Sequence, residues 1–111
     1  MPGALPAAKS RTERFDHQVS QSVSLLEDIY GKTIAGVEFG VEDVPPSSPA
    51  WWESGAVPLG RYFPADAGLP HRIVIYRRPI ITRTFSPAHQ FELITQVLIE
   101  QIVHMTGKEP D

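Results

Sequence analysis

The final apolar run of the chain, from Ser86 to Gly107, is the feature that most constrains the fold. Ser86 can cap a helix, Pro87 suits the first helical position, and Gly107 offers a left-handed stop. At about 100° per residue, the main apolar face of this helix consists of Phe91, Ile94, Leu98, Ile102 and Met105. Other apolar residues lie on either side of that face. A helix this apolar around its circumference is usually buried, so we expect the rest of the domain to pack around it.

One narrow stripe of the same helix is polar. Its members follow each other at spacings of three or four and are His89, Glu92, Gln96, Glu100 and His104. Glu100 and His104 are one turn apart, the spacing at which two helical side chains can hold one metal ion. A solvated face of a core helix is the simpler interpretation of the stripe. Spacing alone leaves both interpretations open.

Composition bounds the classes of protein to consider. With 111 residues and 41% hydrophobic content, the chain can form one small domain with a single core. A net charge of -3 argues against general nucleic-acid affinity, and the absence of cysteine excludes disulfides and thiolate metal sites. No apolar run approaches the roughly 20 residues that span a bilayer. The start of the chain lacks the continuous apolar core of a signal peptide, so we expect a cytoplasmic protein without a membrane partner.

The first part of the chain predicts a tail followed by a helix. Residues 1–10 are small and unpatterned, and we expect a disordered tail there and a single domain over 11–111. Thr12 is the expected helix cap, and Gly31 the expected stop. The apolar stripe between them consists of Phe15, Val19, Val23, Leu26, Ile29 and Tyr30.

Three segments predict a small sheet. Residues 34–44 alternate with a period of two, which indicates a half-buried strand with one wet face. Glu38 and Glu42 on that face are catalytic carboxylates in principle, but charges on an edge strand explain them more simply. Residues 59–63 indicate a short second strand, and 71–76, apolar on both faces, indicate the central one.

The connecting segments carry two features with alternative interpretations. Trp51 and Trp52 lie in a loop rich in Pro and Ser, where a ring can cover the core or contact a partner. Four arginines form a local basic patch, which can bind phosphate, an acidic peptide or nucleic acid, although pairing with nearby acidic residues is the simpler explanation. They are Arg72, Arg77, Arg78 and Arg83. Residues 80–85 are expected to form a short helical or irregular bridge into the long helix.

Five segments resemble those of a known family, the small bacterial zincin-like metallopeptidases, also called minimal metalloproteases, and especially their actinobacterial branch. The segments are R-F-D-H-Q-V, V-E-F-G-V-E-D-V-P-P, V-P-L-G-R-Y-F-P, H-R-I-V-I-Y-R-R-P-I and E-Q-I-V-H-M-T-G, which together cover most of Arg14 to Gly107. The resemblance implies an α+β fold with an N-terminal helix, a mixed sheet of about three strands and a long C-terminal helix.

The resemblance also assigns roles to positions of the last helix. The family carries H-E-x-x-H, whose two histidines bind zinc and whose glutamate activates the zinc-bound water. By position, the first ligand falls on Glu100, the catalytic glutamate on Gln101 and the second histidine on His104. The family's glycine is kept as Gly107, and its downstream acidic residue falls on Pro110.

These departures change the implied chemistry. Glu100 can still be a zinc ligand, and Glu109 or Asp111 can stand in for Pro110 only if the chain turns. The amide of Gln101 has no proton affinity near neutral pH, so it cannot act as the base. The sequence therefore predicts a zincin-like fold without peptidase activity, no tightly held zinc, and a peptide or protein partner. The alternative is a zinc-dependent peptidase with the non-standard ligands Glu100 and His104.

Overall fold

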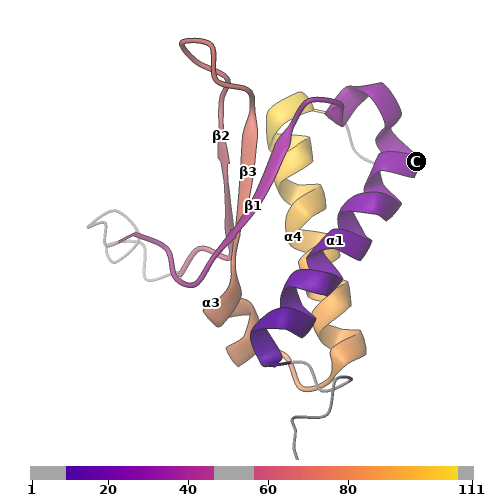
Figure 1. Cartoon of the computed structure of the whole chain (residues 1–111), viewed down its shortest axis with the longest axis vertical. Coiled ribbons are helices and arrows are strands. Elements are labelled where there is room, and N and C mark those ends of the chain that lie inside the picture. The colour runs from indigo at the N-terminus through magenta and orange to yellow at the C-terminus, as the bar shows by residue number, and fades with distance from the viewer. Residues whose placement is uncertain (1–9, 47–56, 108–111) are drawn as a thin grey trace, which may run out of the picture.

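The structure is a computed structural model that describes residues 10–46 and 57–107. Its elements in chain order are α1 (Arg11–Tyr30), the 3-10 helix η1 (Gly31–Ile34), β1 (Glu38–Glu42), β2 (Gly60–Phe63), β3 (Arg72–Tyr76), α3 (Arg77–Thr82) and α4 (Pro87–Thr106). Figure 1 shows two layers, with the sheet on one side and the two long helices on the other. The α+β fold class predicted from the sequence is therefore confirmed.

Helix α4 has both of its predicted ends. The Ser86 hydroxyl accepts a hydrogen bond from the backbone N–H of His89 at 3.1 Å, Pro87 occupies the first turn, and Gly107 adopts the left-handed conformation with φ 74°. The fully buried residues of the helix are Ile94, Val97, Leu98 and Ile102. The predicted apolar face is thus the core-facing one. Within the described part of the chain, no helix is both long enough and apolar enough to cross a membrane.

Helix α1 begins earlier than the sequence predicted. Ser10, which we had assigned to the tail, is the cap instead of Thr12. Its hydroxyl accepts from the Glu13 N–H at 3.0 Å, and its own N–H donates to the Glu13 carboxylate at 3.0 Å. This reciprocal pair satisfies two free donors at the helix start, which a cap at Thr12 would not do. Gly31 ends the helix as predicted, while Ile29 lies at the edge of the apolar stripe and is half exposed.

The sheet has the order β1-β3-β2, with β1 parallel and β2 antiparallel to β3. Strand β3 is central, and its residues 73–76 are buried on both faces, as predicted. The expected strand over 34–44 is too long at both ends. Ile34 belongs to η1, and Gly36 has a φ of 84°, a conformation that interrupts an extended strand. Strand β1 is an edge strand, which confirms the simpler interpretation of its exposed Glu38 and Glu42.

Helices α1 and α4 run in the same direction along a polar seam. The Gln18 side-chain amide donates to the Pro87 carbonyl at 2.9 Å and accepts from the Gln90 amide at 2.9 Å. About one turn further on, the hydroxyls of Ser22 and Thr95 are 2.6 Å apart. Both helices therefore begin at the same end of the molecule, the lower end in Figure 1. The core between helices and sheet contains Phe15, Val19, Leu26, Ile34, Ile73, Ile75, Ile80, Ile94, Val97, Leu98 and Ile102.

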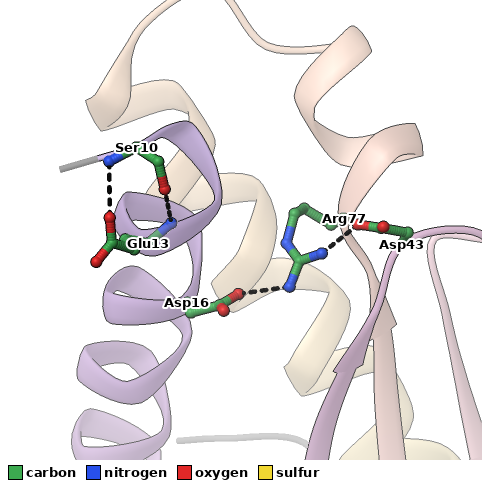
Figure 2. A network of polar contacts seen from close by, with 5 residues as sticks. All are labelled: Ser10, Glu13, Asp16, Asp43 and Arg77. Atoms are coloured by element: carbon green, nitrogen blue, oxygen red, sulfur yellow. Dashed lines mark hydrogen bonds and ion pairs between the residues drawn. The ribbon is translucent and has the colours of Figure 1, made fainter.

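Arg77 joins three elements at the start of α3. Its guanidinium donates to Asp16 of α1 at 2.9 Å and to Asp43, which follows β1 (Figure 2). Only 13% of the Arg77 side chain is exposed. The helical bridge that we expected over 80–85 is present but begins three residues earlier, at Arg77.

Candidate functional site

Strand β2 lies directly on α4 at the position of Gln101. A Cβ added to Gly60 would stand 2.7 Å from Val97 Cγ1, 3.1 Å from the Val74 carbonyl and 3.7 Å from Gln101 Cγ. Contacts below 3.0 Å are too close for carbon atoms, so the approach of strand to helix depends on the missing side chain. Glycine in a strand often marks such a close approach. Gly60 thus places the outer strand of the sheet beside the helix that carries the predicted site.

Within the described residues, the outer edge of β2 has backbone groups that are bonded to no other strand. The N–H of Tyr76 donates to the Leu59 carbonyl at 3.0 Å, so these opposite residues form a hydrogen-bonded pair. Such pairs alternate along an antiparallel ladder, which makes Arg61 and Phe63 bonded to β3 as well. The backbone N–H and C=O of Gly60 and Tyr62 therefore point away from β3. In residues 10–46 and 57–107, no strand pairs with this edge.

A cluster of three rings lies where β2, β3 and α4 meet. The Tyr62 hydroxyl is 2.8 Å from Nδ1 of His71, and the rings are stacked with centroids 5.7 Å apart. The centroid of the Tyr62 ring is also 6.2 Å from that of the His104 ring, and the two rings are tilted by 59°. The backbone N–H of Ala65 also donates to His71 Nδ1 at 3.2 Å, so this nitrogen is an acceptor and the neutral ring carries its proton on Nε2.

Tyr62 and His71 were not among our predicted site residues. Their only signal in the sequence is that they flank a short connection between two strands. Whether their side chains lie near α4 depends on the register of the sheet. The structure adds both of them to His104, which the helical spacing had identified. His104 was thus the predicted member of this cluster, and Tyr62 and His71 are the members that the sequence did not indicate.

The predicted residues of α4 take different positions. Glu100 and His104 are exposed, as expected for a solvated face, while Gln101 is half buried beside β2. In the described part of the structure, no hydrogen bond joins Glu100 to His104, and no group of three His, Cys, Asp or Glu side chains is placed to hold a metal ion. A catalytic zinc normally has three protein ligands. The donor set of the described residues therefore does not fit a catalytic zinc, and Pro110 with its acidic neighbours lies outside them.

The remaining candidates are the two tryptophans and the arginines of the basic patch. Trp51 and Trp52 lie outside the described residues. Arg72 is 3.8 Å from Glu42, and Arg77 is bound by two carboxylates, so acidic partners take up part of the basic patch. Arg83 donates to the Pro79 carbonyl at 2.9 Å. The ion pairs of Arg72 and Arg77 confirm the simpler interpretation for these two residues, namely pairing with nearby acidic residues.

The arrangement of sheet and helix agrees with a comparison of the sequence with protein families. The family model described as zincin-like metallopeptidase matches residues 34–111. The chain belongs to this family. The match begins at the end of η1 and includes the whole sheet and α4, so α1 precedes it. A comparison with curated proteins found no match. Membership in the family agrees with the α+β fold of the chain.

Proposed function

We propose that this zincin-like chain does not hydrolyse peptides and instead binds an extended peptide segment along the free edge of β2. The observation that carries the proposal is the position of this edge. Gly60 and Tyr62 point their backbone groups outward beside α4, and the Tyr62, His71 and His104 rings lie at the same place. An added strand would gain main-chain hydrogen bonds from the edge and side-chain contacts from the rings.

The residue at the position of the family's base supports the absence of hydrolysis. Gln101 carries an amide, which cannot accept a proton from water or pass one to a leaving amine. Loss of such a base typically lowers a rate by about 10²–10⁴-fold. The second candidate, a zinc peptidase with Glu100 and His104 as ligands, has two donors on an exposed helix face and lacks the base.

Hydrolysis is tested with a fluorogenic peptide, with and without added zinc. We expect no turnover above background from the wild type, and little change in Gln101→Glu alone. The pair Glu100→His with Gln101→Glu should gain zinc affinity before activity, because two histidines one turn apart form the core of a zinc site. Zinc-dependent turnover by the wild type, abolished by a chelator, would refute this part of the proposal.

Binding is tested by substitutions at Tyr62. The probe is a pool of capped, proline-free hexapeptides, titrated while the backbone amide signal of Gly60, which every variant keeps, is followed by NMR. Tyr62→Pro removes one outward N–H, which edge strands tolerate, whereas Tyr62→Ala removes the ring and keeps the N–H. We expect binding to be weaker in Tyr62→Pro than in Tyr62→Ala, by about fivefold for one hydrogen bond. Equal binding by the two variants would exclude strand addition at this edge.

A further inference from the structure

A second surface lies at the opposite end of α4, where α1 and α4 both begin. It is a groove of about 610 Å³ between the first turns of α1 and the segment that joins α3 to α4. Arg11, Arg14 and His17 line one wall, and Phe85, Ser86 and Pro87 line the other. Pro87 and His104 are 17 positions apart in one helix, or about 25 Å along its axis. The groove is thus separate from the β2 edge.

The groove is positively charged in a chain whose net charge is -3. No acidic side chain is among the described residues that line it, and neither Arg11 nor Arg14 makes an ion pair with a described residue. The neighbouring acids are engaged elsewhere, since Glu13 bonds Ser10 and Asp16 bonds Arg77 (Figure 2). The parallel helices also place two positive dipole ends at this end of the molecule, which adds to the attraction for anions.

One rim of the groove is apolar and exposed. The Phe85 side chain is 93% exposed, so its ring contributes almost nothing to the core of this chain. It is held in place by stacking on His89, with ring centroids 5.9 Å apart. Arginine and aromatic side chains are the residue types enriched at the centres of protein interfaces. A ligand for this groove should therefore combine negative charge with an apolar side chain.

We propose that the groove binds an acidic peptide segment of a partner protein, with its carboxylates on Arg11 and Arg14 and an apolar side chain against Phe85. The chain's own first residues do not fit as the occupant, because residues 1–9 contain Lys9 and no acidic residue. Three residues of the groove lining are held by the hydrogen bonds among Gln18, Gln90 and the Pro87 carbonyl. Side chains that are already ordered reduce the entropic cost of binding.

The test uses the full chain and a fluorescein-labelled peptide of Asp, Glu and Ser around one central Phe. Binding is measured by fluorescence anisotropy, and the side-chain amide signals of Gln18 and Gln90 report its place by NMR. Arg14→Glu is compared with Lys32→Glu, which changes the net charge equally at an exposed residue of η1. We expect Arg14→Glu to weaken binding by about fivefold or more and Lys32→Glu by less than about twofold. Phe85→Ser should weaken binding by about fivefold.

Control probes define the chemistry of the ligand. A peptide with Ser in place of Phe should bind more weakly, and one with Lys in place of the acidic residues should not bind. If Arg14→Glu fails to fold by circular dichroism, Phe85→Ser carries the test, because an exposed ring is not needed for folding.

Five results would overturn the proposal. Three concern the peptide: no binding of the acidic probe, equal effects of Arg14→Glu and Lys32→Glu, and unchanged Gln18 and Gln90 signals on binding. The fourth is displacement of the peptide by low millimolar inorganic phosphate, which would indicate a simple anion site. The fifth is self-association of the wild-type chain that is abolished by Arg14→Glu, because the occupant would then be a second copy.

Discussion

Replacement of Arg77 by Met should destabilise the fold by about 2 kcal/mol. Hydrogen bonds to charged groups contribute about 1.5–3 kcal/mol each when buried. The carboxylates here are 47% exposed at Asp16 and 61% exposed at Asp43, so water can solvate them after the change, and we discount both contacts by roughly half. Met keeps an unbranched apolar side chain but loses the guanidinium carbon, which lies 5.9 Å from the centroid of the Phe15 ring. Burial alone would lower the pKa of Arg77, but the two carboxylates outweigh it and raise the pKa, so the contacts act on a charged group.

Thermal and urea unfolding followed by circular dichroism measure this effect. For a domain of this size, about 2 kcal/mol corresponds to roughly 8 °C in Tm. The matched control is Arg78→Met, an exposed neighbour, which should change stability by less than about 0.5 kcal/mol. A double-mutant cycle of Arg77→Met with Asp16→Asn should show a coupling above about 0.5 kcal/mol. If Arg77→Met unfolds with the same Tm as Arg78→Met, Arg77 does not join the three elements energetically.

Two further predictions concern the sheet. Gly60→Ala should lower the free energy of unfolding in urea by about 1–3 kcal/mol, because its Cβ would stand 2.7 Å from Val97 Cγ1. The control is Gly40→Ala, whose Cβ would meet only the flexible end of Arg72 at 3.3 Å and which should cost under about 1 kcal/mol. Similar values for both variants would refute the close approach of β2 to α4. Burial, and secondarily the charge of Glu42, raises the pKa of Tyr76 above its ordinary value of 10.0. The unfolded chain therefore loses the Tyr76 proton at a lower pH than the folded chain does. The free energy of unfolding should fall as the pH rises above 10.0 toward the higher folded pKa. Tyr76→Phe should flatten that fall, and an unchanged slope would exclude Tyr76 as its source.

The sequence predicted best the elements in which several local signals agree. Helix α4 has a cap, an N-terminal proline, a periodic apolar face and a terminal glycine, and the structure has all four. Strand β3 was identified as central because it is apolar on both faces, and it is buried on both. Each of these signals comes from residues close together in the chain, so the elements can be predicted without knowing any tertiary contact.

The errors arose where two local signals compete or where the deciding contact is distant. Ser10 and Thr12 are both good capping residues, and only Ser10 has a glutamate three positions later. Pairing of Arg77 with acidic residues was the simpler interpretation, but its partners could not be named because they lie 34 and 61 positions away in the chain. The contact of Tyr62 with His71 and His104 likewise depends on the sheet register and on the packing of β2 against α4.

The fold of this family and the chemistry of its helix depend on different faces of α4. Ile94, Leu98 and Ile102 are fully buried, and truncating such a residue typically costs about 2–5 kcal/mol. Glu100 and His104 lie on the exposed face of the same helix, where substitutions usually change stability by about 0.5 kcal/mol or less. A change at these two exposed positions can therefore alter metal binding almost without effect on the fold. This difference in cost explains how a chain of the zincin-like family can keep its fold while the exposed side chains at positions 100 and 104 vary.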